Sequence, residues 1–448
     1  MRQVLLYSVL LMSGLLISQF LGESGAFTIK MLTMFTLAYI MIHVGYEFEI
    51  DKSRPGQYAW DYVVAATAAG FPWLFCALYF VFVMGPAELW FHGDMWKEAL
   101  LEGRFASPTS AGVLFSMLTA AGLAATWVFN KARILAIFDD LDTILLMLPL
   151  TFMMVGFRWQ LMAVVAVMLF LLWLAWQYLD AVRLPITWPY VLGYAALLTF
   201  ASEAVYQGSK GIDPAAPVHL EVLLPAFVWG CILAPPKMAS RNGEAESRPR
   251  EEVFERRGEK RVSLIVTASF MVLVGLSMPP LRPYAAPSAV SAEGNADEVA
   301  IGAKRTGHDR QMPEQLQYEG VPADVLAAKQ AFPGWDIIAL HVLVITLLSN
   351  LGKMFPLFCY RREASLRERL AVTLCMFPRG EVGAGVLVVS LSYGLSGPAI
   401  TVAVLSLVLN LLCTGAFIVA VRKLTASAKQ TAVPPRRRGR YRLRKVAT

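Results

Sequence analysis

Apolar runs of about 20 residues recur along the whole chain, and they constrain its fold more than any other feature. A helix of that length spans the ~30 Å hydrocarbon core of a bilayer. Of the 448 residues, 56% are hydrophobic and 16% are charged, whereas a typical soluble domain is about a quarter charged. We therefore expect an all-α polytopic membrane protein with about twelve transmembrane helices. The expected spans are 4–21, 29–47, 60–84, 108–127, 131–154, 159–179, 184–205, 218–234, 262–279, 335–358, 367–392 and 398–421.

Lysine and arginine concentrate in the loops that follow the even-numbered spans. Examples are Lys52 with Arg54, Lys131 with Arg133, and the basic tail 422–448. Because cytoplasmic loops carry the excess of basic residues, this distribution predicts that both termini are cytoplasmic. We expect a multi-pass protein of the cell (inner or plasma) membrane.

Composition divides the chain further. The N-terminal membrane part, 1–234, contains a first helix trio within 60–154, and a second trio lies within 335–421. The connections between them are a charged cytoplasmic linker (235–261), a membrane helix (262–279) and an external Pro/Ala/Glu-rich insertion (280–334). We expect this insertion to be mostly disordered, except for a short helix in "VPADVLAAKQAF".

Two expected spans carry a helix breaker with polar neighbours. One begins "FASPTSAGVLFSML" around Pro108, and the other contains "LCMFPRGEVGAG" around Pro378. Proline removes a backbone donor, and freed backbone groups at membrane depth must face protein or a water-filled cavity. A simple kink explains one such proline. Two of them, in the middle helices of trios with opposite orientation, favour an inverted repeat with two discontinuous crossing helices and a binding site between them.

The stretch "AIFDDLDTILLMLP" places three aspartates in one membrane span, each at a cost of roughly 2.5–3.5 kcal/mol on insertion scales. Asp139 and Asp140 lie about 100° apart on a helix, and Asp142 lies about 60° to the other side of Asp139. The adjacent pair should titrate as a coupled set, and carboxylate oxygens suit hard cations. Asp142 points elsewhere, as a hydrogen-bonded or water-facing group.

Other charges in the spans suggest partners. Buried charges are usually paired, and Lys353 in "LGKMFP" is the natural partner of Asp139. Arg379 and Glu381 point to different sides of their helix and each need another partner, so Arg379 is expected in a structural ion pair. Glu203 lies near the outer end of its span, where we expect a surface-exposed role.

These motifs resemble those of the bacterial cation:proton antiporters (sodium/proton antiporters, the monovalent cation:proton antiporter-2-like branch). The similar segments follow the family's order over most of residues 29–421. They are "LAYIMIHVGYEFEID", "SPTSAGVLFSMLTAAGL", "ARILAIFDDLDTILLMLP", "FMVLVGLSM", "LGKMFP" and "LCMFPRGEVGAGVLVVSLSYGL". The resemblance implies the sodium/proton antiporter fold and a secondary transporter rather than an enzyme.

The resemblance also implies roles for individual residues. Asp140 is the main carboxylate for cation and proton, and Asp139 shares the Na⁺ site while pairing with Lys353 in the ion-free state. Thr109 and Ser110 line the helix crossover beside these carboxylates. Arg379 and Glu381 belong to the coupling charges, and the accessory positions are Asp142, Pro108 and Asn350.

The paired aspartates together with Lys353 imply electrogenic exchange of protons for Na⁺, also Li⁺, with K⁺ as the alternative cation. The family implies a homodimer. We expect no cofactor and no nucleic-acid partner. Asp142 and Thr143 depart from the family, which normally has apolar residues or glycine at these positions.

Two other functions fit less well. An intramembrane aspartyl protease needs aspartates on two facing helices, with a Gly-x-Gly-Asp turn on one, whereas the pair here lies on one helix. A channel or sensor on the same scaffold stays open, and ion flux without proton coupling would distinguish it. No glycine-rich dinucleotide fingerprint follows span 398–421, which argues against the ligand-gated potassium-efflux branch.

Overall fold

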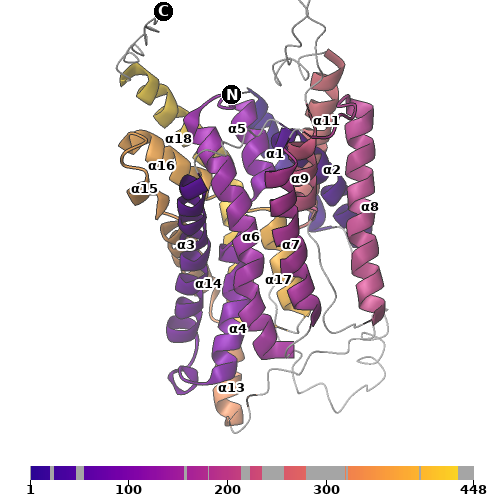
Figure 1. The fold of residues 1–448 in the computed structure, drawn as a ribbon. Coiled ribbons are helices and arrows are strands. Elements are labelled where there is room, and N and C mark those ends of the chain that lie inside the picture. Colours follow the sequence, from indigo (N-terminus) through magenta and orange to yellow (C-terminus); the bar gives the residue numbers. More distant parts are fainter. Residues whose placement is uncertain are drawn as a thin grey trace, which may run out of the picture.

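The computed structural model describes residues 2–20, 25–46, 55–155, 159–179, 181–212, 222–234, 257–278, 318, 321–392 and 395–431. Within these ranges every regular element is a helix, and the only extended pairing is an isolated bridge between Val182 and Leu233. The helices run roughly side by side along the length of one bundle (Figure 1).

The first half of the chain forms α1 (Arg2–Ser18), α2 (Ala26–Tyr46), α3 (Pro55–Tyr79), α4 (Gly93–Gly103), α5 (Ala111–Ala120), α6 (Trp127–Val155), α7 (Trp159–Gln177) and α8 (Trp188–Ile212). The second half forms α9 (Leu223–Ile232), α11 (Arg257–Leu276), α13 (Ala323–Gln330), α14 (Trp335–Gly352), α15 (Pro356–Cys359), α16 (Leu366–Cys375), α17 (Glu381–Ser392) and α18 (Pro398–Thr431).

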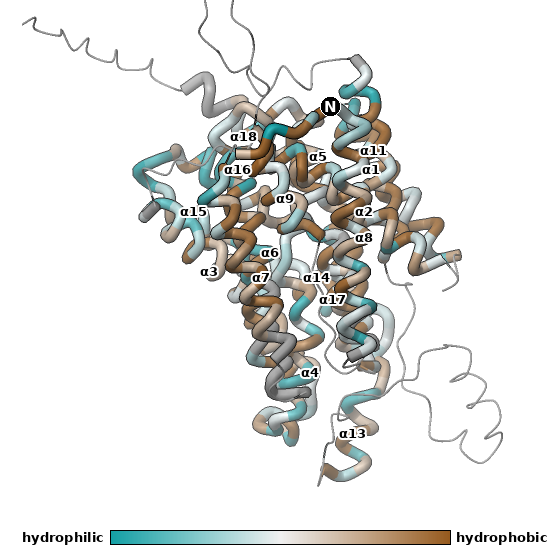
Figure 2. Tube along the Cα trace, turned by 45° about the vertical axis from the view of Figure 1, so that its right-hand side comes forward, coloured by the Kyte–Doolittle hydropathy of each residue, from teal (hydrophilic) through white to brown (hydrophobic). Residues whose placement is uncertain are grey.

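Four helical segments of the described chain are long and apolar enough to cross a membrane: Ala26–Tyr46, Gly56–Met84, Trp335–Cys359 and Pro398–Ala426. Three shorter apolar helices lie beside them, at Arg2–Ser18, Met162–Gln177 and Leu223–Ile232. In Figure 2, hydrophobic residues, coloured brown, are spread along the helices of the bundle. The all-helical, apolar architecture agrees with the predicted helical membrane protein.

The first turn of α1 and the C-terminal part of α18 lie at the same end of the bundle, and α13 lies at the other end (Figure 1). The short helix predicted in "VPADVLAAKQAF" is therefore present as α13. Most of the linker 235–261 and of the insertion 280–334, the loop with Lys52 and Arg54, and the tail from 432 lie outside the described residues.

The bounds predicted for span 108–127 were wrong, because this element starts earlier and its last helix ends at Ala120, whereas the break near Pro108 is present. It begins with α4, continues through a 3-10 turn at Arg104–Ala106, loses helical form over 107–110, and resumes as α5. The sequence of α4, "GDMWKEALLEG", contains three acidic residues and one lysine among its eleven residues. Hydropathy alone therefore does not reveal it as part of a membrane element.

The second broken element matches the predicted span 367–392. Helix α16 ends at Cys375, residues 376–380 are not helical, and α17 begins at Glu381. In Figure 1, the chain passes from α4 at the lower end to α5 at the upper end, and from α16 at the upper end down to α17. The two broken elements thus run in opposite directions.

Glycines allow two helix pairs to approach very closely. A Cβ atom on Gly45 of α2 would lie 2.1 Å from the carbonyl oxygen of Phe227 in α9, and one on Gly230 would lie 2.2 Å from that of Ile42. Gly14 of α1 and Gly275 of α11 face each other in the same way. Small residues are the usual means of close helix packing in membranes.

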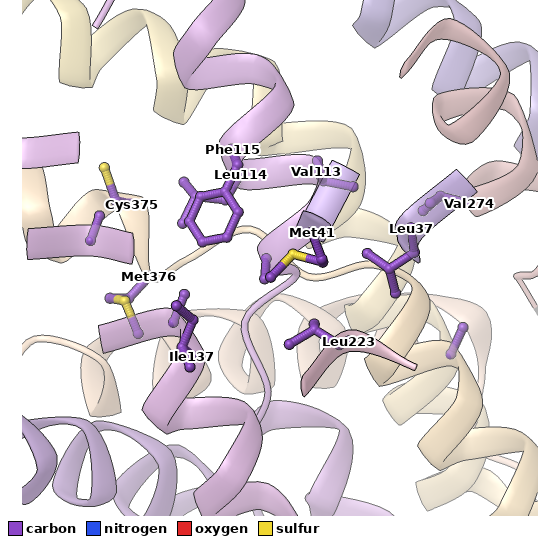
Figure 3. Close-up of a cluster of buried hydrophobic side chains, with 14 of the residues drawn as sticks. Leu37, Met41, Val113, Leu114, Phe115, Ile137, Leu223, Val274, Cys375 and Met376 are labelled. Atoms are coloured by element: carbon purple, nitrogen blue, oxygen red, sulfur yellow. The ribbon is translucent and has the colours of Figure 1, made fainter. Parts of the chain in front are cut away.

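A buried apolar cluster surrounds the place where the broken elements meet. Figure 3 shows Phe115 of α5, Ile137 of α6 and Met376 gathered there, with Leu37 and Met41 of α2 nearby. All five side chains are buried. This packing fixes the two non-helical segments against α6, which carries the aspartates.

Candidate ion site

The non-helical segments of the two broken elements bind each other directly. The backbone N–H of Ser110 donates to the carbonyl oxygen of Pro378 at 3.0 Å, and the Thr109 hydroxyl donates to the carbonyl oxygen of Met376 at 2.9 Å. Gly380 leaves no room for a side chain, since a Cβ there would lie 2.7 Å from Ser110 Oγ. Backbone groups that the prolines free from helices are therefore used across the crossing.

Asp139 of α6 lies at this crossing. The Thr109 N–H donates to its Oδ2 at 2.7 Å, and the Lys353 ammonium lies 2.7 Å from Oδ1 and 2.8 Å from Oδ2. The carboxylate thus faces the start of α5, where the helix dipole favours negative charge. The predicted contact between Asp139 and Lys353 is present, and both side chains are fully buried.

Lys353 also ties the first broken element to α14. Its ammonium donates to the Ser107 carbonyl oxygen at 2.5 Å, at the end of the first half of that element. A cation is favourable there, because the carbonyls at a helix C-terminus carry partial negative charge. One lysine therefore compensates both the negative charge of Asp139 and the partial negative charge at the C-terminal end of the first half-helix.

We predicted a structural ion pair for Arg379, but the partners that the described residues give it are backbone carbonyls. Its guanidinium donates to the carbonyl oxygens of Pro108 and Ser349, each at 3.1 Å, and it is fully buried. Hydrophobic periodicity cannot foresee this role, because a non-helical segment supplies one of the acceptors. Glu381 begins α17, and its side chain lies outside the described part of the structure.

Asp140 and Asp142 lie on different sides of α6, as the helical angles predict. Asp140 is 5% exposed and lies within electrostatic reach of Lys353. Asp142 is 2% exposed and accepts a hydrogen bond from the hydroxyl of Tyr62 in α3. The third aspartate is therefore bound to a neighbouring helix, and it also interacts electrostatically with Asp139 and Lys353.

Asn350, an accessory candidate, points to α18. Its side-chain amide donates to Asn410 Oδ1 at 2.9 Å, so it connects α14 to α18 rather than contacting the aspartates. Pro108 contributes its carbonyl oxygen to Arg379. Both candidates thus support the arrangement of helices around the crossing.

A second buried charge cluster was missed by the sequence analysis. Asp61 of α3 lies 3.0 Å from the Lys131 ammonium and accepts from the Tyr360 hydroxyl at 2.8 Å, and all three residues are buried. The sequence analysis places Lys131 in a loop, but it lies in the second turn of α6, with its ammonium over the Tyr360 ring. Arg133 is buried too, and donates to Val44 O.

The expectation for Glu203 was also wrong. It is buried, and its Oε2 lies 3.0 Å from the Lys30 ammonium of α2. Gln207, one turn further along α8, donates to the other carboxylate oxygen at 2.6 Å. Proximity to a helix end suggested exposure, whereas packing of α2 against α8 covers this carboxylate.

No group of three or more His, Cys, Asp or Glu side chains that could hold a metal gathers in the described residues. The oxygens near the crossing that could hold a small hard cation are those of the aspartates, the backbone carbonyls and the hydroxyls. Oxygen ligands of this kind suit hard cations, and unwound carbonyls serve as such ligands in transporters with broken helices.

Comparison with models of known protein families found no match for this chain, and a search of curated proteins found no similar sequence.

Proposed function

We propose that this protein is a secondary antiporter that exchanges protons for a monovalent cation, Na⁺ or Li⁺, at Asp139 and Asp140. The observation that carries the proposal is the crossing itself. Two broken elements of opposite direction meet through Thr109 and Ser110, against a buried aspartate held by Lys353. Sites of this form, between discontinuous helices, are typical of secondary transporters.

Competition for the carboxylates supplies the coupling. With Asp140 protonated, the Asp139 carboxylate and the Lys353 ammonium balance each other, and the site is neutral. A cation entering from one side displaces the Asp140 proton and takes over Asp139 as a ligand. Lys353, having lost its counter-ion in a buried place, gives up a proton as well, because an unpaired buried charge is costly.

This sequence of steps balances two protons against one cation. The ion-free site holds one ammonium, one carboxylate and one carboxylic acid, which sum to zero. The loaded site holds one cation, two carboxylates and a neutral amine, which sum to minus one. Each cycle therefore moves one net charge, and the exchange is electrogenic.

The remaining features fit the same proposal. The chain would form the sodium/proton antiporter fold of about twelve spans, with α4 to α5 and α16 to α17 as the corresponding broken helices of an inverted repeat. Both termini would be cytoplasmic, and the functional unit in the cell membrane would be a homodimer.

The test is exchange in proteoliposomes with an acid interior and a pH-sensitive dye. External Na⁺, Li⁺ or K⁺ is added with and without an imposed voltage, and choline serves as the control cation. We expect dequenching with Na⁺ and Li⁺ that responds to voltage. Dequenching with K⁺ alone would reassign the cation, and cation flux without proton movement would remove the antiporter proposal.

A further inference from the structure

A second pair of carboxylates lies on α4, the half-helix that leads into the crossing. Glu98 and Glu102 are one turn apart, so they lie on the same face of α4, and both are buried. Glu102 precedes Ser107 by about 8 Å of helical rise. This pair plays no part in the proposed exchange at α6.

Helix α13 packs near Glu98 and provides a lysine that pairs with its carboxylate. The Lys329 ammonium lies 2.5 Å from Glu98 Oε2, and the hydroxyl of Tyr318 donates to the same oxygen. The ammonium also lies 5.0 Å from the centre of the Tyr318 ring, which stacks on His92 at 5.3 Å. None of the residues of α13 is itself buried, so these contacts tie it to α4.

Glu102 has one oxygen without a hydrogen-bond partner in the described structure. Its carboxylate accepts the backbone N–H of Ile400 near the start of α18, whereas Oε1 is buried and unpartnered. The carboxylate interacts electrostatically with Glu98 and Lys329, so it faces them. A buried carboxylate oxygen that lacks a partner is costly.

If both carboxylates are ionised, the described charges of Glu98, Glu102 and Lys329 sum to minus one, and the nearby Asp94 and Lys97 form their own pair at 2.8 Å. In that state one further monovalent cation would balance the charge, and the unpartnered Oε1 of Glu102 is an oxygen ligand of the type that hard cations prefer.

We propose that Glu98 and Glu102 form a second cation site, for which Lys329 of α13 is a tethered competitor. With Lys329 bound to Glu98, the site is half filled and binds a free cation weakly. When Lys329 is removed, both carboxylates become ligands for Na⁺. The choice of Na⁺ as the cation rests on the proposed function, whereas the site itself does not.

The test measures Na⁺ binding to the full-length protein in detergent by isothermal titration calorimetry, with choline maintaining ionic strength. All variants carry Asp140→Asn, which disables the proposed transport site. Lys329→Met removes the competing cation. Lys97→Met is the matched control, because it removes an equal charge from α4, where Lys97 pairs with Asp94 and not with Glu98.

We expect Lys329→Met to tighten Na⁺ binding by about tenfold, since a tethered group competes at millimolar effective concentration. Lys97→Met should leave the affinity unchanged. Adding Glu98→Gln or Glu102→Gln to the Lys329→Met protein should abolish the tightened binding. Equal affinities of the two lysine variants, or binding that survives both glutamine substitutions, would overturn the proposal. Because the readout is binding without transport, a failure of the antiporter proposal leaves this result unaffected.

Discussion

The Lys353 ammonium lies within hydrogen-bond distance of both carboxylate oxygens of Asp139, at 2.7 and 2.8 Å. Both residues are fully buried, and they come from helices that are far apart in the sequence. This pair joins α6, α14 and the end of the first half-helix. The pair therefore stabilises the crossing. In the proposed cycle, it is formed in the ion-free site and broken when the cation binds.

The first prediction concerns Lys353→Met, which leaves the Asp139 carboxylate buried without its cation. Breaking a buried ion pair from one side typically costs about 3–5 kcal/mol, so the detergent-solubilised variant should melt at a clearly lower temperature. The double variant Asp139→Asn with Lys353→Met removes both charges and should recover most of the loss. A single variant as stable as the parent would contradict the structural role of the pair.

The second prediction concerns the other buried pair, Asp61 with Lys131. Asp61→Ala leaves Glu363, 3.4 Å away, as the one carboxylate partner of the Lys131 ammonium among the described residues. It should lower the melting temperature about as much as Lys353→Met. Gln57→Ala is the control, since that side chain reaches Glu363 on the exposed side. If both variants melted alike, the cluster would not stabilise the contact of α3 with α6.

The third prediction concerns the close approach of α2 and α9. Gly45→Ala places a methyl group 2.1 Å from the Phe227 carbonyl oxygen, so the helices must separate, and over-packing of this kind typically costs about 1–3 kcal/mol. Gly193→Ala on α8 is the matched control, because nothing lies within 4 Å of its added Cβ. The control should be neutral or slightly stabilising, since alanine favours helix more than glycine does. Equal melting temperatures for the two variants would contradict this packing.

Several features of the fold were accessible from sequence, because they depend on local composition. The apolar runs indicated helices, Pro108 and Pro378 indicated the two breaks, and Lys353 as the only basic residue of its span indicated the partner of Asp139. The angle between neighbouring residues on a helix was enough to place Asp142 on a different side of α6 from Asp140.

Other features depend on tertiary contacts and were not accessible. The buried carboxylates of α4 contact α13 and the start of α18, and these contacts help to compensate their burial. Its hydropathy is therefore low, like that of a loop, although much of the helix is buried. Lys131 looked like a topology signal because its partner Asp61 lies 70 positions away in the chain. The partner of Asp142 was hidden for the same reason, since Tyr62 comes from α3.

The central claim is that Asp140, and not Asp142, exchanges proton for cation. The direct test compares Asp140→Asn with Asp142→Asn in proteoliposomes, using Na⁺-triggered dequenching of a pH-sensitive dye and equal amounts of reconstituted protein. Asp142 is bound to Tyr62, so its substitution should preserve exchange, whereas Asp140→Asn should abolish it. Normal exchange by the Asp140→Asn protein would contradict the mechanism proposed for this site.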